Sequence, residues 1–276
     1  MPTDDPVIIT VAPTGPLTTR ANHPDLPVTP EEIGRAVAEA AEAGAAVAHV
    51  HARGADERPT ADPAVYAQIA EEIRKRCDIV VQASTGVGLE VTPEDRLEII
   101  ASGEVEVTMA TLNPASMTFG QGTFSNPPWF VDRLAELMKE RGIQPELEIY
   151  DFGHVGLCAD LVRRGLVDGP LQFSFVMGVR GGMPGDPALL PTLISMLPDG
   201  SIWQAIGIGR AQLPLSFAAL ALGGNVRVGF EDNVYFHKGQ LAESNAQFVR
   251  RAVELVHAAG REVASPAYVR QRLGVK

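Results

Sequence analysis

The sequence predicts an α/β fold, a (β/α)8 TIM barrel that occupies residues 1–276 as a single domain. Eight short apolar segments alternate along the chain with eight segments of helical periodicity, which is the element pattern of this barrel. The length of 276 residues suits one large α/β barrel or two small domains, but no linker or shift in composition divides the chain. A doubly wound sheet is the alternative, and it usually has fewer strands and an open edge.

The predicted strands are short and bounded by turn residues. Several are almost continuously apolar, which is typical of parallel strands covered on both faces. The eight strands are VIITVAP (7–13), AAVAHVHA (45–52), DIVVQAST (78–85), VEVTMAT (105–111), PELEIYD (145–151), LQFSFVMG (171–178), SIWQAIGIG (201–209) and NVRVGFED (225–232).

The clearest predicted helix spans residues 29–45. Thr29 is a good N-cap, Pro30 occupies the first helical position, and Gly44 is a typical terminator. The apolar residues of this segment recur at helical spacing, so one face can pack on the sheet. The other predicted helices cover residues 61–76, 92–103, 127–142, 154–165, 186–197, 210–224 and 242–262.

Charge and cysteine content limit the functions to be considered. The formal net charge of -11 argues against non-specific binding to nucleic acid or to an anionic membrane, although a local basic pocket could still bind a small anion. The two cysteines, Cys77 and Cys158, lack metal-ligand spacing and fit a reducing compartment. The N-terminal MPTDDPVIIT lacks the features of a signal peptide, and no apolar run reaches the length of a membrane span. We therefore expect a cytoplasmic protein.

Two histidines end the predicted second strand, in the stretch AAVAHVHARG. His49 and His51 are two residues apart, so their side chains point to the same face of a strand. The carboxyl ends of barrel strands form the active-site face, and two imidazoles there can bind one metal ion. The alternative is one buried structural histidine beside a solvent-facing one. The position of the pair favours the metal site.

A catalytic metal site needs a third protein ligand and an open position. Glu231, beside Asp232 at the end of the predicted eighth strand, is the best candidate, although it could instead cap a helix or pair with Arg227. Zinc suits this ligand set best, with manganese and iron as alternatives. Glu148 lies inside a predicted strand and also needs a partner, such as Arg227. The remaining histidines are poorer ligand candidates because of their predicted positions: His23, His154, His237 and His257.

Short polar side chains gather at the ends of the predicted third and fourth strands. They are Ser84, Thr85, Thr111 and Asn113. Each residue type is common in turns and caps. Together they indicate a polar rim around one small ligand.

Two loops carry candidate contacts for a cofactor. The stretch VMGVRGGMPGDP, which includes Gly181 and Gly182, matches neither a P-loop nor a dinucleotide-binding fingerprint. It is either a flexible loop or a place where the backbone approaches a ligand, such as a phosphate or a pantetheine chain. Arg210 follows the predicted seventh strand, at a position where barrels often bind anionic groups.

Several motifs occur together, in order, over essentially the whole chain: APTGPLTTR, HVHAR, QASTG, MATLNPAS, PELEIYD, GVRGGMPG, GIGR and RVGFEDNVYFHKGQLAESNAQ. Together they resemble the β-keto acid cleavage enzymes, a family that includes the 3-keto-5-aminohexanoate cleavage enzyme. The combination of HVHAR with GFEDN is the most specific part of this resemblance.

The resemblance implies a reaction and a set of site residues. A β-keto acid and acetyl-CoA are converted into acetoacetate and a new acyl-CoA through a retro-Claisen cleavage. A divalent metal, normally zinc, is held by the residues matching His49, His51 and Glu231. Asp232 matches the base that removes an α-proton, and Arg227 is its partner.

The resemblance assigns weaker roles to other residues. Ser84, Thr111, Asn113 and Glu148 match positions that line the substrate site or assist proton movement. The family also implies a homotetramer or a larger assembly. The apolar segments PPWF and VYF could form its interface, although burial in the core explains them as well.

The sequence departs from the family at the end of the first strand. Members that cleave the amino-substituted substrate carry a glutamate there, which can pair with the substrate ammonium. In this chain the stretch is Thr14-Gly15-Pro16-Leu17, and Leu17 occupies that position. We expect Thr14 and Leu17 to contact the substrate. Because a buried ammonium without a counter-charge is costly, the substrate is expected to be a neutral, aliphatic β-keto acid.

Two other functions are compatible with a metal-binding barrel. The first is that of another metal-dependent barrel hydrolase or lyase. An amidohydrolase-like hydrolase would usually carry its histidine pair on the first strand and further histidines on the fifth and sixth strands. In this chain the pair lies on the second strand, and LQFSFVMG contains no histidine. A non-catalytic metabolite-binding barrel is the remaining alternative, and the intact set of Glu231, Asp232 and two histidines argues against it.

Overall fold

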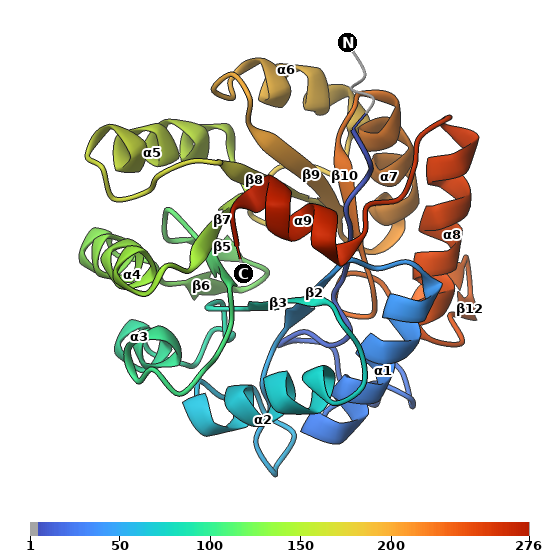
Figure 1. Cartoon of the computed structure of the whole chain (residues 1–276), viewed down its shortest axis with the longest axis horizontal. Coiled ribbons are helices and arrows are strands. Elements are labelled where there is room, and N and C mark those ends of the chain that lie inside the picture. The colour runs from blue at the N-terminus through green and yellow to red at the C-terminus, as the bar shows by residue number, and fades with distance from the viewer. Residues whose placement is uncertain (1–4, 276) are drawn as a thin grey trace.

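The computed structural model describes residues 5–275 as a barrel of parallel strands surrounded by helices (Figure 1). The strands close in the order β1-β10-β9-β8-β7-β4-β3-β2, and every neighbouring pair for which a register is defined is parallel. The closed barrel confirms the predicted (β/α)8 fold and excludes the doubly wound sheet, which has open edges.

The barrel strands all lie within or overlap the predicted segments. They are β1 (Ile9–Val11), β2 (Val47–Val50), β3 (Val80–Ala83), β4 (Met109–Leu112), β7 (Gln144–Ile149), β8 (Gln172–Met177), β9 (Ile202–Gly207) and β10 (Asn225–Val228). The clearest error is in the last strand, which ends at Val228 instead of continuing to residue 232. There the backbone N–H of Asp232 donates to the carbonyl of Gly229 (3.2 Å), so Glu231 and Asp232 lie in a turn at the barrel mouth.

The helices on the outside of the barrel agree with the predicted periodicity. They are α1 (Pro30–Ala43), α2 (Pro63–Arg74), α3 (Pro93–Ala101), α4 (Pro128–Arg141), α5 (Phe152–Arg163), α6 (Leu190–Ser195), α7 (Gln212–Ala221) and α8 (Asn245–Ala258). Short 3₁₀ turns, η1 (Pro187–Leu189) and η2 (Gly209–Ala211), lead into α6 and α7. The predicted start of α1 is confirmed, since the side chain of Thr29 accepts from the backbone of Glu32 in a capping box.

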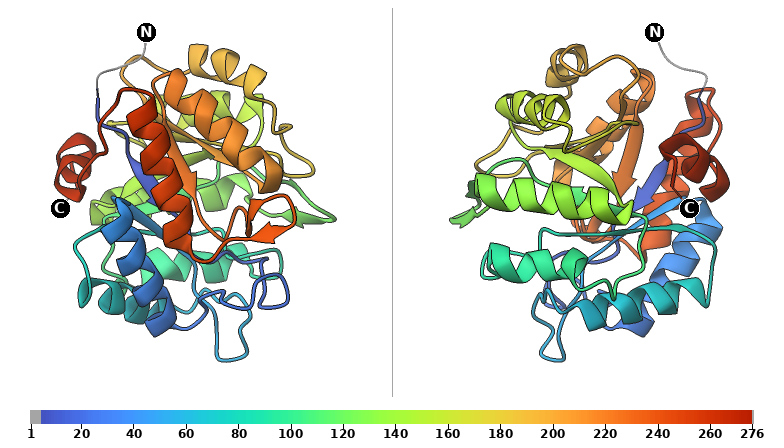
Figure 2. Two further views of the ribbon diagram at one scale, coloured as in Figure 1. Left: turned by 90° about the vertical axis from the view of Figure 1, so that its right-hand side faces the viewer. Right: turned by 60° about the vertical axis from the view of Figure 1, so that its left-hand side comes forward.

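Three features of the structure were not predicted. Helix α9 (Pro266–Leu273) lies across the amino ends of the strands, at the centre of the ring in Figure 1. Its Val269 and Leu273 pack on the first residues of the strands, such as Val47 and Val80. Two hairpins, β5–β6 (117–124) and β11–β12 (235–241), project from the opposite end of the barrel (Figure 2). Helix α9 therefore closes the amino-terminal end of the barrel, and the end that carries the two hairpins is the open one.

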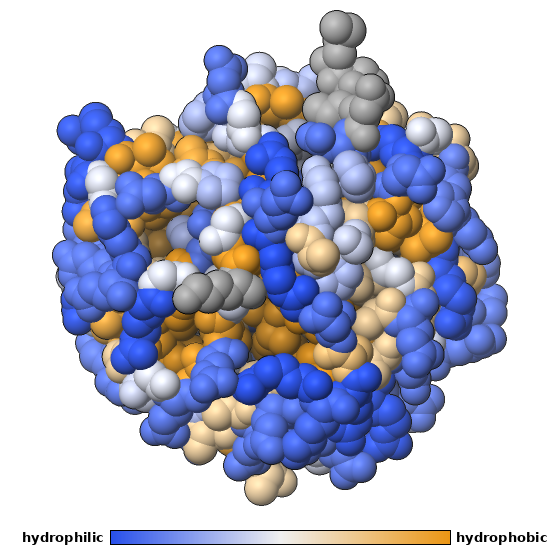
Figure 3. Space-filling model, in the orientation of Figure 1, coloured by the Kyte–Doolittle hydropathy of each residue, from blue (hydrophilic) through white to orange (hydrophobic). Residues whose placement is uncertain are grey.

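The surface at the end covered by α9 is mostly hydrophilic, with apolar side chains visible in hollows around the centre (Figure 3). Within residues 5–275, no helix combines the length and apolar character that a bilayer span requires. Most large apolar side chains are buried in the core, which leaves the surface mainly to polar and charged residues.

The inside of the barrel is polar on several strands. The amide layer, which we define as Gln82, Glu146, Gln172 and Gln204, lies in the barrel interior and is at most 2% exposed. The hydroxyls of Thr10 and Ser174 hydrogen-bond to Gln204 at the same level. The outward-facing strand residues, such as Val11 and Ala48, belong to the apolar core shared with the helices. The functional groups described next lie on the carboxyl side of the amide layer.

Candidate active site

Three predicted metal ligands converge at the mouth of the barrel. Nε2 of His49 lies 3.6 Å from Oε1 of Glu231, and Nε2 of His51 lies 3.4 Å from the same oxygen. One donor atom from each residue falls within 4.8 Å of the others. Both histidines are almost completely buried. This is the one group of three or more potential metal ligands found among residues 5–275, so the predicted set is brought together.

The other histidines serve structural or surface positions. Nε2 of His23 contacts the carbonyl oxygen of Ala242 (2.8 Å), and Nδ1 of His154 accepts from the backbone of Tyr150 (3.3 Å). His237 and His257 are exposed. None of these four residues belongs to the group of potential ligands formed by His49, His51 and Glu231.

The loop after β1 packs closely against the side chain of Glu231. A Cβ atom added to Gly15 would lie 2.4 Å from Cγ of Glu231, so only glycine permits this approach. Arg53 is buried and anchors the same loop, donating to the carbonyls of Gly15 and Thr18, the latter at 2.6 Å. The position of Glu231 thus depends on a loop that the strand pattern alone did not identify as part of the site.

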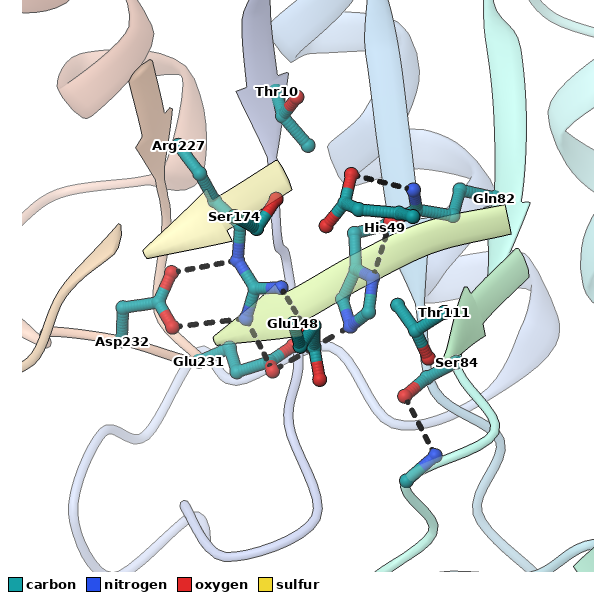
Figure 4. Close-up of polar contacts among 12 residues, drawn as sticks. Thr10, His49, Gln82, Ser84, Thr111, Glu148, Ser174, Arg227, Glu231 and Asp232 are labelled. Atoms are coloured by element: carbon teal, nitrogen blue, oxygen red, sulfur yellow. Dashed lines mark hydrogen bonds and ion pairs between the residues drawn. The ribbon is translucent and has the colours of Figure 1, made fainter. Parts of the chain in front are cut away.

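Arg227, on β10, holds the two acidic residues of the following turn (Figure 4). Its Nε and Nη2 donate to the two carboxylate oxygens of Asp232, at 3.0 and 2.9 Å, and Nη2 also donates to Oε1 of Glu231 at 2.5 Å. Nη1 lies 3.6 Å from Oε1 of Glu148. The predicted pairing of Arg227 with both Asp232 and Glu148 is present in the structure.

The site carries more buried negative charge than its arginine balances. Glu148, Glu231 and Asp232 face one guanidinium. Burial raises the pKa of Glu148, and it raises the pKa of Asp232 to about 6 despite Arg227. Burial also opposes ionisation of Glu231, but Arg227 and the two histidines hold its pKa well below the usual range. A divalent cation would complete this charge distribution.

The two imidazoles differ in their surroundings. Burial and Arg227 oppose a charge on His49, but Glu231 and Glu148 outweigh them and raise its pKa. Burial lowers the pKa of His51, which favours the neutral form that binds metals. Nδ1 of His49 contacts Oε1 of Gln82 at 2.7 Å, whereas Nδ1 of His51 has no hydrogen-bond partner among the described residues.

A cavity of about 460 Å³ opens above these groups. Its floor is polar and includes both histidines, Glu148, Arg227, Glu231, Asp232 and Ser84. Its walls are mainly apolar, although Gln121, Tyr150 and Arg180 also line the cavity. The apolar residues are Pro16, Leu17, Leu89, Phe119, Phe124, Val176, Val179 and Ile208. Leu17 lines the cavity and is 55% exposed. It is the residue at the position where the resemblance implies a glutamate in members that cleave the amino-substituted substrate. The cavity has the size and composition of a site for a small organic acid.

The predicted polar rim is divided between the cavity and the framework. Ser84 lines the cavity, and its Oγ accepts from the backbone of Gly86 at 3.2 Å. Thr85 and Thr111 bond to each other's backbones: Oγ1 of Thr85 donates to the carbonyl of Thr111, whose Oγ1 accepts from the N–H of Thr85. The roles of these residues in substrate binding stay predictions.

Two more residues predicted to bind substrate are buried near the mouth. The side chain of Asn113 and the hydroxyl of Thr14 are buried, and their polar atoms have no hydrogen-bond partner within residues 5–275. Buried polar atoms without partners are costly, so both side chains are candidates to bond a ligand.

The loop after β8 packs against the β5–β6 hairpin. Gly181 has a φ of 102°, and an added Cβ would lie 2.3 Å from the carbonyl oxygen of Thr118. A Cβ atom added to Gly182 would lie 2.9 Å from the carbonyl oxygen of Tyr150. These contacts give both glycines a structural reason, and their predicted contact with a cofactor stays a prediction.

Arg210 lies beside a second cavity next to the first. This cavity is also lined by Arg180, and the two cavities share the segment 178–180 and Ile208. Both arginines are exposed at the mouth. The first cavity therefore adjoins a cavity that is lined by two exposed arginines.

Three contributors to the site were missed by the sequence reasoning. Phe119 and Phe124 come from the unpredicted β5–β6 hairpin and form part of the wall. Gln82 contacts His49 from the neighbouring strand. A polar residue inside the apolar run DIVVQAST was the available signal for Gln82, whereas the short hairpin has no strong apolar pattern.

Residues 6–275 match the family model described as beta-keto acid cleavage enzyme. The chain belongs to the family of β-keto acid cleavage enzymes. This confirms the resemblance based on the HVHAR and GFEDN motifs.

Two characterised relatives are equally similar to this member of the family. The 3-keto-5-aminohexanoate cleavage enzyme of Fusobacterium nucleatum is 38% identical over 272 residues, covering 98% of each chain. The 3-oxoadipate:acetyl-CoA acetyltransferase of Cupriavidus necator is 38% identical over 275 residues, covering 98% of this chain and 95% of the relative.

The fold is also found in a solved structure, that of apo ObcA. The TM-score is 0.81 at 22% sequence identity, and the match covers 91% of this chain but only 66% of the ObcA chain. At this identity the likeness supports the barrel fold alone.

Proposed function

We propose that this β-keto acid cleavage enzyme is metal-dependent and transfers the acyl group of a β-keto acid with a neutral, aliphatic tail to coenzyme A. The co-substrate is acetyl-CoA and the second product is acetoacetate. The observation that carries this proposal is the convergence of His49, His51 and Glu231 beside the Arg227–Asp232 pair on the floor of a largely apolar cavity. The names of the two relatives support the class of reaction.

The three predicted ligands fit a divalent cation. Both Nε2 atoms face the same oxygen of Glu231, and its other oxygen, Oε2, is buried without a hydrogen-bond partner among the described residues. Two imidazoles and one carboxylate are a ligand set of catalytic zinc, with manganese and iron as alternatives. Bound there, the cation would polarise the keto oxygen of the substrate and stabilise negative charge on it.

The surroundings of Asp232 support the proposal that it acts as the general base. Arg227 bonds to both of its carboxylate oxygens and so fixes the plane of the carboxylate, while the residue still lines the cavity. In the proposed first step Asp232 takes a proton from the carbon between the keto and carboxylate groups. The resulting carbanion attacks the thioester carbon of acetyl-CoA, and the CoA thiolate leaves.

The second half of the reaction breaks a carbon–carbon bond. The CoA thiolate attacks the original keto carbon and forms the new thioester. The bond between that carbon and the former α-carbon then breaks, and Asp232 returns the proton to the departing acetoacetate carbanion. Glu148 and Ser84 lie at the cavity floor and are proposed to orient the reacting groups during these proton movements.

The cavity walls support a neutral substrate tail. The acidic residues that line the cavity are Glu148, Glu231 and Asp232, which are at the floor and already face Arg227. Leu17 lies on the wall and offers no counter-charge to an ammonium group. Because sequence identity does not separate the two relatives, the cavity is the better guide to the substrate.

The second cavity is the proposed location of acetyl-CoA. A pantetheine chain could follow the shared segment 178–180 past Ile208, with Gly181 and Gly182 close to its path. Arg210 and Arg180 would then face the nucleotide phosphates. A cytoplasmic location and a homotetramer also belong to this proposal. Trp129 of PPWF and Tyr235 of VYF, at 48% and 50% exposed, are candidate interface residues.

A product assay tests the proposed reaction. The enzyme is incubated with a metal salt, acetyl-CoA and either 3-oxohexanoate or 3-keto-5-aminohexanoate, and acyl-CoA products are measured by mass spectrometry. We expect butanoyl-CoA and acetoacetate from the alkyl acid, with a higher kcat/KM than for the amino-substituted acid. A higher kcat/KM for 3-keto-5-aminohexanoate would contradict the proposal of a neutral substrate tail. Consumption of the keto acid without acyl-CoA formation would contradict the transferase reaction.

A further inference from the structure

Glu146 lies beneath the candidate metal site, and none of the steps above uses it. It is on β7, two residues before Glu148, and is completely buried. Its Oε2 accepts hydrogen bonds from the Nε2 atoms of Gln82 (2.8 Å), Gln172 (3.0 Å) and Gln204 (3.1 Å). An ionised carboxylate can only accept hydrogen bonds, and here all three donors on this oxygen are amides.

Gln82 connects this carboxylate to the metal site. A side-chain amide has a donor end and an acceptor end. Because its NH₂ group faces Glu146, its Oε1 faces the opposite direction, where it meets Nδ1 of His49 at 2.7 Å. A carbonyl oxygen accepts, so Nδ1 of His49 must carry a proton.

The position of that proton decides which nitrogen can bind a metal. A neutral imidazole with its proton on Nδ1 has its free lone pair on Nε2. Nε2 is the nitrogen of His49 that faces Glu231. His51 has no corresponding contact, because its Nδ1 lacks a partner within the described part of the chain. Of the two candidate histidine ligands, His49 is therefore the one whose tautomer is specified by a described side chain.

We propose that Glu146 is a positioning residue for metal binding: acting through Gln82, it fixes the tautomer and the ring orientation of His49. The negative charge of Glu146 holds the amide of Gln82 in one of its two orientations. A neutral side-chain amide at position 146 can both donate and accept, so it would allow the amide of Gln82 to flip. Its NH₂ would then donate to Nδ1 of His49, and the ring proton would move to Nε2, where it blocks the metal.

The variant Glu146→Gln tests this relay with nearly unchanged shape. The inference rests on the proposed metal site, but the tautomer can be read without metal. In metal-free protein labelled with ¹⁵N-histidine, at an alkaline pH where imidazole is neutral, we expect the Nδ1–H tautomer of His49 in the wild type. In Glu146→Gln we expect a mixture, or the Nε2–H form. The affinity for Zn²⁺, measured by competition with a chromogenic chelator, should fall about 10- to 100-fold.

Two further variants separate positioning from packing. Gln82→Met removes the direct acceptor and should likewise give mixed tautomers and weaker Zn²⁺ binding. Gln172→Met removes a donor to the same carboxylate oxygen but leaves the contact between Gln82 and His49, so it should retain the wild-type tautomer and Zn²⁺ affinity.

Two results would overturn the proposal. One is an unchanged His49 tautomer in Glu146→Gln. The other is a loss of Zn²⁺ affinity in Gln172→Met as large as in Glu146→Gln, because a general disturbance of the amide layer would then explain both. If the wild type binds no Zn²⁺, the metal site itself is wrong, and the tautomer measurement still decides the role of Glu146.

Discussion

Two polar layers lie one above the other inside the same barrel, and they are built differently. In the amide layer a single carboxylate, Glu146, is surrounded by amide donors, and the hydroxyls of neighbouring strands join the same network. In the mouth layer three carboxylates and two imidazoles face one guanidinium. Residues on the same strands contribute to both layers, for example Glu146 and Glu148 on β7.

The two layers differ in whether their unsatisfied buried polar groups line the cavity. At the mouth, Oε2 of Glu231, Nη1 of Arg227 and Nδ1 of His51 have no hydrogen-bond partner among residues 5–275. In the amide layer, each glutamine bonds through its NH₂ group, but Oε1 of Glu146 and Oε1 of Gln172 also lack a partner among the described residues. Unsatisfied buried groups cost stability, and they are retained where a ligand completes them. The unsatisfied groups of the mouth line the cavity, where a ligand can complete them, and no residue of the amide layer lines it. The lower layer is therefore expected to support stability and the mouth to support function.

The largest expected effect is the removal of a metal ligand. His49→Ala and His51→Ala should each abolish detectable turnover and reduce bound metal to background, because two remaining ligands hold a divalent ion poorly. In His51→Ala the free energy of unfolding of the metal-free protein should change little, since Nδ1 of His51 makes no hydrogen bond among the described residues. In His49→Ala it should fall by about 1–3 kcal/mol, because Oε1 of Gln82 loses its buried partner. Metal analysis, turnover and denaturant unfolding check this, with the exposed His257→Ala as control. Metal retained at wild-type stoichiometry in both variants would refute the ligand assignment.

The next largest effect is a loss of turnover without a loss of bound metal, expected when the proposed base, Asp232, is replaced. Asp232→Asn keeps a polar partner for Arg227 but removes the base, so turnover should fall about 10²- to 10⁴-fold. Metal content should stay at the wild-type value. The exposed Asp199→Asn, in the turn before β9, serves as the matched control. Turnover within a few-fold of wild type would show that another group removes the proton.

A substitution in the lower layer should show the opposite pattern. Gln204→Leu leaves Thr10, Glu146 and Ser174 each without one hydrogen bond. The free energy of unfolding should fall by about 1–3 kcal/mol, measured by urea denaturation. The kcat should stay close to the wild-type value. A large loss of kcat with an unchanged free energy of unfolding would contradict the expectation that the amide layer supports stability and the mouth supports function.

The smallest effect is a shift in substrate preference. Leu17→Glu places a carboxylate on the cavity wall, where it can pair with a substrate ammonium. Because position 17 is partly exposed, we expect the ratio of kcat/KM for the amino-substituted over the alkyl acid to rise only about tenfold, equivalent to ~1.4 kcal/mol. Leu17→Gln is the uncharged control. Equal ratios for the two variants would remove charge as the cause.

Much of the mouth was accessible from the sequence because barrel topology places all strand ends together. His49 and His51 could be read as a pair from their spacing alone, and Glu231 and Asp232 from their place after the last apolar strand. The strand was predicted four residues too long there, since the apolar pattern does not reveal the turn that follows Val228.

The supporting residues were harder to predict because their roles depend on contacts between distant segments. Gln82 and Glu146 are 64 positions apart, and their alignment depends on the registers of β3, β4 and β7. Arg53 and Gly15 meet through loop carbonyls, which have no periodic signal. Helix α9 and the hairpins are short and pack on elements far away in the chain, so local pattern is weak for them.

Metal analysis combined with reconstitution tests the central claim most directly. The enzyme is stripped with a chelator, dialysed, and titrated with Zn²⁺ while bound metal and acyl-CoA formation are measured on the same samples. We predict that activity returns in proportion to bound metal and saturates at one ion per chain, and that His51→Ala shows neither. Full acyl-CoA formation by the stripped enzyme, or saturation that is unchanged in His51→Ala, would contradict a site formed by His49, His51 and Glu231.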